Sequence, residues 1–284
     1  MTRFSNYSHI PAKLQSELIG TDPFDYMMKL KGEVFRNVPG RKTLRFQVAG
    51  KSYFAKLHYG VGWREIFKNL LSFKRPILSA ITEVKAIQAL NQIDIPTTPL
   101  VAYGKRGWNP AHIQSFVVTK DLGEIISLED LISDWKMNPP TTKFKRKLIV
   151  AVAELAKKLH ENGLNHRDFY ICHLCMDTSS VDEETTIVAQ IKLYLIDLHR
   201  MLIHKNPNAR DNMKDIAALY FSSMDMGLNA RDYLRFKHYY SKNFTSVNKS
   251  FWQKVTVRAN KLYAKFHSDK FQQRLAVEKA ALKK

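Results

Sequence analysis

Residues 165–173, with the sequence Asn-His-Arg-Asp-Phe-Tyr-Ile-Cys-His, decide the fold of this chain. They follow a long stretch, residues 143–160, in which apolar side chains recur at helical spacing. Gly163 lies just beyond that predicted helix, in the position where glycine commonly ends a helix. Downstream, the apolar run of residues 193–196 ends in an acid, Asp197. The arrangement predicts a polar loop after a helix, followed by a strand that presents a second acid.

The tripeptide His166-Arg167-Asp168 is typical of the catalytic loop of eukaryotic-type kinases, in which a metal ligand follows five residues after the aspartate. On this pattern Asp168 is the base that accepts the proton of an attacking hydroxyl, and His166 and Arg167 support the loop. His173 stands where the pattern normally has asparagine, and we expect His173 and Asp197 to be the Mg²⁺ ligands. The alternative interpretation of so short a match is an ordinary surface turn after a helix.

Lys56 and Glu83 occur upstream in the order that a kinase requires. Lys56 lies in an apolar stretch, residues 54–57, and we expect it to bridge the α- and β-phosphates of ATP. Glu83 comes 27 positions later (83 − 56), in the strongly helical stretch 79–90, and this spacing fits an ion pair that holds the lysine toward ATP. The alternatives are a solvated lysine on a strand and a glutamate in a surface salt bridge.

Two further segments take predicted roles around these residues. Residues 120–123, Lys-Asp-Leu-Gly, are the expected hinge, in which the backbone groups of Lys120 and Leu122 bind adenine. Asp215 lies near the start of a helix predicted to begin at Met213, where it is placed to anchor the backbone of the catalytic loop. It is equally well explained as a first-turn acid at the N-terminus of that helix.

The chain upstream of the hinge has the pattern of an antiparallel sheet. Residues 33–36, 43–48 and 52–57 are separated by turn signals and predict a three-stranded meander, which residues 100–104 and 114–119 extend.

The first turn of this meander covers the phosphates in a kinase, but here it has no G-x-G-x-x-G. It contains one glycine, Gly40, followed by Arg41 and Lys42. We therefore expect basic side chains to take over part of the phosphate binding from backbone amides. The alternative is a plain hairpin turn.

Together these segments predict an α+β, bilobal protein-kinase-like fold with a small antiparallel β-sheet lobe and a larger, mainly helical lobe. The expected divisions are a lead-in and small lobe at 1–119, a hinge at 120–123, a large lobe at 124–241 and a basic helical segment at 242–284. Short helices are expected in the lead-in at 16–19 and 24–28.

The chain carries a net charge of +19, from 45 Lys and Arg against 26 Asp and Glu among 284 residues, which favours an acidic partner. Residues 242–284 hold 11 of the basic side chains and only 2 of the acidic ones. The stretch 63–75 mixes basic residues with apolar ones at helical spacing. It is explained either by packing on the small lobe or as an amphipathic surface that touches anionic lipid.

No apolar run reaches the roughly 18–20 residues that span a bilayer, and the N-terminus has no signal-peptide pattern, so a cytoplasmic protein is expected. The two cysteines, Cys172 and Cys175, have C-x-x-C spacing. They are explained as a redox pair, as half a zinc site, or simply as reduced thiols of a cytoplasmic protein.

The chain resembles the lipopolysaccharide core heptose(I) kinases of Gram-negative bacteria over most of residues 30–240. The resemblance rests on residues 50–54 with Lys56, and on the stretches 69–72, 126–130, 165–173, 196–200 and 219–224. The histidine at position 173 belongs to the pattern of that family, so it does not argue against catalysis.

The resemblance implies transfer of the γ-phosphate of ATP, with Mg²⁺, to a hydroxyl of the first heptose of the lipopolysaccharide inner core. It implies a peripheral protein on the anionic cytoplasmic face of the inner membrane, with the lipopolysaccharide core as acceptor and acyl carrier protein as a further, acidic partner. A nucleic-acid partner is not expected. The competing hypotheses are a kinase of the same fold that acts on a protein, an aminoglycoside or another sugar, and a non-catalytic basic module that binds membranes.

Overall fold

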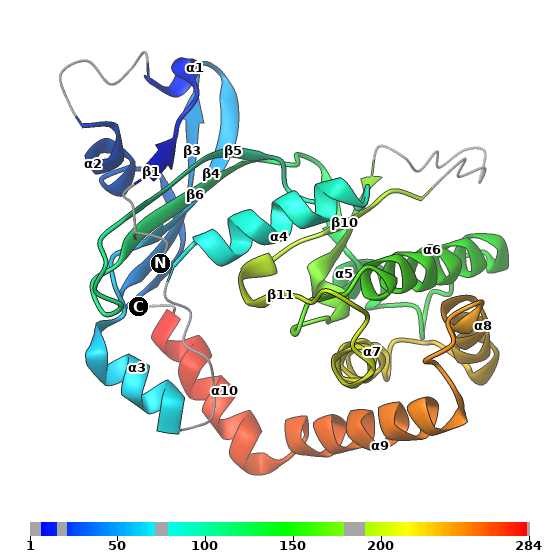
Figure 1. Cartoon of the computed structure of the whole chain (residues 1–284). Coiled ribbons are helices and arrows are strands. Elements are labelled where there is room, and N and C mark those ends of the chain that lie inside the picture. Colours follow the sequence, from blue (N-terminus) through cyan, green and yellow to red (C-terminus); the bar gives the residue numbers. More distant parts are fainter. Residues whose placement is uncertain (1–6, 16–21, 72–78, 179–190, 283–284) are drawn as a thin grey trace. The chain divides into compact units, whose positions relative to one another are not determined.

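An antiparallel sheet of six strands forms the frame of the first of two units into which the chain divides (Figure 1). The structure is a computed structural model that describes residues 7–15, 22–71, 79–178 and 191–282. Unit 1 contains residues 1–123 and 195–201, and unit 2 contains residues 124–194 and 202–284. The strands of unit 1 lie in the order β1-β5-β6-β4-β3-β2 and are β1 (Tyr7–His9), β2 (Glu33–Val38), β3 (Arg41–Val48), β4 (Lys51–His58), β5 (Leu100–Arg106) and β6 (Gln114–Lys120).

The two faces of this sheet pack against different helices. Side chains alternate between the faces of a strand, so Leu57 of β4 joins Leu44 and Phe116 in a core with Phe24 and Met27 of α2. The opposite face packs on α4 through apolar side chains at Ala80, Val84 and Val117. Lys56 therefore points away from the main core, toward the face that α4 covers. The helices of unit 1 are α1 (Ala12–Gln15), α2 (Pro23–Met28), α3 (Gly62–Leu71) and α4 (Ile81–Gln92).

The segment Leu195–Met201 belongs to unit 1, although it follows the catalytic loop in sequence and was expected within the large lobe. The N–H of Leu195 donates to the carbonyl of Pro96 at 2.9 Å, and the hydroxyl of Thr97 donates to the carbonyl of Leu195 at 2.6 Å. Leu198, in a 3₁₀ turn, is almost completely buried. Because of these contacts, Asp197 belongs to the same unit as Lys56.

Unit 2 is mainly helical, as expected. Its helices are α5 (Leu128–Ile132), α6 (Thr142–Glu161), α7 (Ala209–Ser223), α8 (Ala230–Ser241), α9 (Lys249–Phe266) and α10 (Asp269–Leu282). A small sheet has the order β10-β9-β7, with β7 at Ile125–Ser127, β9 at Leu174–Asp177 and β10 at Leu193–Leu195, where the chain passes into unit 1. Two short strands, β8 (Leu164–Asn165) and β11 (Leu202–Ile203), form a separate antiparallel pair.

The observed elements confirm the predicted α+β class, with an antiparallel sheet in one unit and mostly helices in the other. The expected helix at 24–28 is α2, whereas the helix at 16–19 and the expected loop within 179–190 lie outside the described residues. In the described part of the chain, no helix combines the length and the apolar character that crossing a membrane requires.

The predicted basic helical segment at 242–284 lies within unit 2, where α9 packs on α7. Phe251 and Val255 of its apolar face are buried, but Phe266 near the end of α9 is 38% exposed. The stretch at 63–75 forms α3 up to Leu71. Of its apolar side chains, Ile66 is buried while Trp63 and Phe67 are exposed and stack on each other.

Candidate active site

Lys56 lies between two carboxylates in unit 1. Its Nζ is 2.7 Å from Oε1 of Glu83, on α4, and 3.4 Å from Oδ1 of Asp197. Burial alone would lower the pKa of Lys56, but the carboxylates of Glu83 and Asp197 outweigh it and raise the pKa above its ordinary value. The predicted ion pair is present, and Lys56 is held as a cation.

Asp197 adopts a left-handed backbone conformation, with φ of 59°, two residues after the end of β10. Aspartate enters this region more readily than most residues. Nδ1 of His199 is 2.7 Å from the same Oδ1 that faces Lys56. His199, which the sequence interpretation did not select, therefore orients the Asp197 carboxylate. The sequence feature that could have pointed to His199 is its position two residues after Asp197, a predicted metal ligand.

The backbone of the predicted catalytic loop is fixed by one buried acid. Oδ2 of Asp215 accepts a hydrogen bond from the N–H of His166 at 2.7 Å, and Oδ1 accepts one from the N–H of Arg167 at 2.9 Å. Arg167 has φ of +70°, a conformation that costs free energy and needs such support. Helix α7 begins at Ala209, four residues before the predicted start, so Asp215 is not a first-turn acid and the anchoring alternative is the one observed.

Further buried groups support Asp215. Oδ2 also lies 3.3 Å from Nε2 of His160, and Nδ1 of that ring lies 2.7 Å from the hydroxyl of Tyr240. A carboxylate only accepts, so Nε2 of His160 donates and Nδ1 accepts from Tyr240. Burial, with the charge of Asp215 second, raises the pKa of Tyr240 well above its ordinary value and keeps it a donor.

The loop also fixes the orientation of His173. Nδ1 of His173 lies 2.7 Å from the backbone carbonyl oxygen of Asp168, and the N–H of Tyr170 donates to the same oxygen at 2.8 Å. A carbonyl only accepts, so Nδ1 carries the hydrogen and Nε2 has the lone pair in the neutral ring. This arrangement is the usual preparation of a histidine for metal binding, although imidazole is a softer ligand than Mg²⁺ prefers.

Each unit thus brings one group of predicted residues together. Unit 1 brings together Lys56, Glu83 and Asp197. Unit 2 brings together Asp168 and His173 with the residues predicted to support the loop, which are His166, Arg167 and Asp215. The two predicted metal ligands belong to different units. Within the described residues of the chain, no group of three or more His, Cys, Asp and Glu side chains forms a metal site.

The expected hinge is partly occupied by its own hydrogen bonds. The N–H of Lys120 donates to the carbonyl of Pro99 at 2.9 Å, so this N–H is not the donor for adenine. The N–H of Asp121 donates to Ser52, whose hydroxyl donates to the Asp121 side chain at 2.8 Å. Adenine binding through the carbonyl of Lys120 and the backbone of Leu122 stays a prediction.

The C-x-x-C pair has the properties of ordinary thiols. Cys172 and Cys175 are both thiols that are not joined in a disulfide, and burial raises the pKa of the Cys175 thiol to about 11. A thiol with so high a pKa is almost entirely protonated near neutral pH, which disfavours both metal binding and disulfide exchange.

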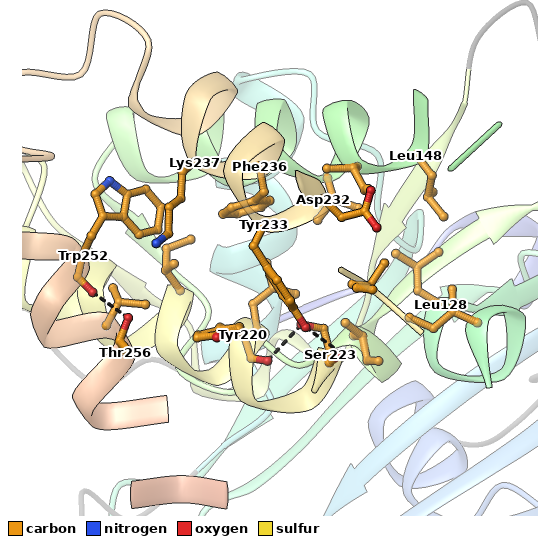
Figure 2. Close-up of a pocket in the computed structure, with 18 of the residues that line it drawn as sticks. Leu128, Leu148, Tyr220, Ser223, Asp232, Tyr233, Phe236, Lys237, Trp252 and Thr256 are labelled. Carbon is orange, nitrogen blue, oxygen red and sulfur yellow. Dashed lines mark hydrogen bonds between the residues drawn. The ribbon is translucent and has the colours of Figure 1, made fainter. Parts of the chain in front are cut away.

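Unit 2 also contains an apolar pocket with a volume of about 110 Å³, lined by side chains of α5 to α9 (Figure 2). Leu128, Leu148, Phe236 and Trp252 line its wall. The hydroxyl of Tyr233 donates to a backbone carbonyl at 3.3 Å, so this polar group is satisfied within the wall. No predicted site residue lies in this pocket.

Comparison with known proteins identifies what the chain is similar to. The model of the lipopolysaccharide kinase (Kdo/WaaP) family matches residues 25–240. The lipopolysaccharide core heptose(I) kinase WaaP of Pseudomonas aeruginosa is 44% identical over 221 residues, which are 78% of this chain and 81% of the relative. The protein of the same name from Escherichia coli K12 is 41% identical over 247 residues, 86% of this chain and 92% of the relative.

A solved structure is also similar over nearly the whole chain. It is described as WaaP in complex with acyl carrier protein. Its kinase chain superposes with a TM-score of 0.75 at 34% identity, covering 90% of this chain and 99% of that chain.

Proposed function

The chain belongs to the lipopolysaccharide kinase (Kdo/WaaP) family, and from this premise we propose that it transfers the γ-phosphate of ATP to a hydroxyl of the first heptose of the lipopolysaccharide inner core. The observation that carries the phosphoryl-transfer part of the proposal is the position of Lys56, 2.7 Å from Glu83 and 3.4 Å from Asp197. A lysine that is fixed between two acids presents one positive charge in one place, as phosphoryl transfer requires.

Lys56 binds the α- and β-phosphates in this mechanism. Glu83, which is only 3% exposed, prevents the lysine side chain from turning away and keeps it charged. Asp197 is the oxygen ligand suited to Mg²⁺, and the hydrogen bond from His199 orients its carboxylate. When bound, Mg²⁺ would neutralise charge on the transferring phosphoryl group.

Asp168 orients the heptose hydroxyl and accepts its proton. Its backbone is rigid because Asp215 holds the two preceding N–H groups and because the carbonyl of Asp168 itself accepts from His173. Positioning of this kind supplies a large part of the rate in phosphoryl transfer, where the protein forms no covalent bond. We propose His173 as a ligand of a second metal ion.

The acceptor is the part of the proposal that the ATP-handling residues do not specify. The test is to incubate the protein with radiolabelled ATP and three acceptors: lipopolysaccharide core that lacks the heptose phosphate, a mixed protein substrate and an aminoglycoside. We expect label in the core alone, released as heptose phosphate on hydrolysis. Label in protein or aminoglycoside, with none in the core, would establish a kinase with another acceptor.

Acyl carrier protein is the partner that we propose for this chain. Its support is the relative solved in complex with acyl carrier protein, together with a net charge of +19 that suits an acidic partner. The apolar pocket of unit 2 suits the acyl chain that such a carrier bears. We expect acylated carrier to bind more tightly than carrier without the acyl chain, as measured by calorimetry. Equal affinities for the two forms of the carrier would show that the pocket does not bind the acyl chain.

The basic charge also supports peripheral binding to the anionic cytoplasmic face of the inner membrane, where the lipopolysaccharide core is assembled. Exposed Lys254, Arg258, Lys261 and Lys265 lie on one side of α9, at spacings of three and four residues. Trp63 and Phe67 are the exposed apolar candidates on α3.

A further inference from the structure

Three neighbouring strands of unit 1 place basic side chains on the face that carries Lys56. In the register of β3 with β4, Arg41 lies opposite His58 and Thr43 lies opposite Lys56. In the register of β2 with β3, Arg36 lies opposite Thr43. Directly opposed residues of antiparallel strands project from the same face, and so do residues i and i+2. Arg36, Arg41 and His58 therefore share one face of the sheet with Lys56.

These side chains also share one pocket. Arg36, Arg41, Lys56 and His58 line it, together with the acids Glu83 and Asp197 and with His199. The lining has four basic side chains, Arg36, Arg41, Lys42 and Lys56, against the two acids, so the pocket has an excess of positive charge. A pocket of this charge distribution suits an anion with several oxygens.

The turn between β2 and β3 is too tight to cradle phosphates in the way a glycine-rich loop does. Val38 pairs with Arg41, which leaves only Pro39 and Gly40 in the turn. Gly40 has φ of +77°, and a Cβ there would lie 2.4 Å from the carbonyl oxygen of Gly60. The carbonyl of Gly40 accepts from the N–H of Tyr59 at 2.9 Å. The turn is thus fastened to the chain that follows β4.

His58 is the second indication of a ligand. It is 5% exposed, and its Nδ1 has no hydrogen-bond partner in the described structure. Burial, followed by the charges of Arg41 and Lys56, lowers the pKa of His58 to about 3, so the ring is neutral. A neutral imidazole can donate one hydrogen bond, and a buried ring nitrogen without a partner is unusual enough to call for a ligand.

We propose that Arg36 and Arg41 bind the β- and γ-phosphates of the nucleotide through their guanidinium groups, with His58 as a neutral donor beside them, in place of a glycine-rich loop. The proposal rests on the proposed function, because it assigns further nucleotide-binding residues to the same site. A guanidinium group makes two parallel, charge-assisted hydrogen bonds to phosphate and brings a net positive charge, whereas a backbone amide donates one hydrogen bond and carries no net charge.

The test measures nucleotide affinity with no acceptor present. Displacement of a fluorescent ATP analogue is measured for ATP, ADP, adenosine and inorganic tripolyphosphate. For Arg41→Ala and Arg36→Ala we expect about 10-fold weaker binding of ATP and of tripolyphosphate and unchanged binding of adenosine. Arg41→Lys should retain part of the affinity, since it keeps the charge but loses the paired geometry.

The matched control is Arg45→Ala. Arg45 lies on the same face of β3 as Arg41, but it is paired with Glu33 at 2.6 Å and lies outside the pocket. We expect this variant to bind all four ligands as the wild type does.

The outcomes separate this proposal from the proposed function. Unchanged ATP affinity in both Arg36→Ala and Arg41→Ala would overturn the arginine proposal, and so would an equal loss of adenosine and ATP affinity together with a lower melting temperature. Arginine-dependent ATP binding without transfer to heptose would refute only the proposed acceptor. A wild-type protein that binds no ATP would refute both.

Discussion

Lys56 and Glu83 are 27 positions apart in sequence and 2.7 Å apart in space, joined through Nζ and Oε1. Glu83 is buried on α4, and a buried carboxylate is stable only with a partner of opposite charge. The sheet supplies that partner from β4, on the face opposite its main core. The ion pair therefore sets the position of the charge that we propose to meet the phosphates.

Lys56→Met should lower kcat by about 10²-fold, the usual loss when one preorganised charge is removed from a transition state. Glu83→Gln should lower kcat in the same direction, because the lysine is no longer held. Lys85→Met is the control, since Lys85 is an exposed lysine on the same helix as Glu83. Steady-state assays will decide, and normal turnover in both site variants would contradict the role of the pair.

Asp215→Ala should destabilise the protein by about 2–4 kcal/mol, because two backbone N–H groups lose a charged acceptor in the interior. The loss should appear as a lower midpoint in urea. Asp211→Asn is the control on the same helix, where a partly exposed pair with Lys214 contributes about 1 kcal/mol or less. Equal midpoints for the wild type and Asp215→Ala would show that the loop does not need this anchor.

The sequence was sufficient for those parts of the site that depend on local patterns or fixed spacings. The helix at Thr142–Glu161, which precedes the predicted catalytic loop, and the pair of Lys56 with Glu83 are of this kind. Helix α5 has a local signal of the same kind, since Ser127, an N-cap residue type, accepts from the N–H of Asp130.

Other features depend on contacts between distant segments and could not be read from the pattern. Strand β1 is three residues long and exposed, so it has no apolar alternation to identify it. The N–H of Lys120 is occupied only because Pro99, the residue before β5, lies beside it. The start of α7 is different, because a local signal was present: Asn208 is the N-cap and accepts from the N–H of Asp211. The prediction nevertheless placed the start of this helix four residues too late.

His58 should make the protein less stable in acid. Its pKa is about 3 in the folded protein and about 6.5 in an unfolded chain, because burial and the charges of Arg41, Lys56 and His199 oppose protonation. Between these values the unfolded state binds more protons, so stability falls as pH falls, by up to about 1.4 kcal/mol per pH unit.

The measurement compares urea midpoints of the wild type and His58→Gln from pH 7 to pH 4.5. Carboxylates that titrate in both proteins cancel in the difference, and we expect His58→Gln to lose less stability in acid. Parallel pH profiles would show that His58 is not a buried neutral ring.

Binding to vesicles with anionic lipid should weaken steeply as salt rises, because exposed charges are screened beyond about 8 Å at physiological salt. Replacing Lys254, Arg258, Lys261 and Lys265 by Gln should weaken sedimentation with such vesicles, at about 1 kcal/mol per charge. Trp63→Ser with Phe67→Ser tests α3 instead, and both side chains are exposed enough for the variant to fold. Equal binding to neutral and anionic vesicles would rule out electrostatic recruitment.

Transfer of radiolabelled phosphate from ATP to the dephosphorylated heptose of the lipopolysaccharide core, compared between the wild type and Asp168→Asn, tests the central claim most directly. Asp168→Asn keeps the shape of the side chain and removes the base, so transfer should fall by about 10²–10⁴-fold while the affinity for ATP stays nearly unchanged. An Asp168→Asn protein that labels the heptose at a near wild-type rate would contradict the assignment of the catalytic loop.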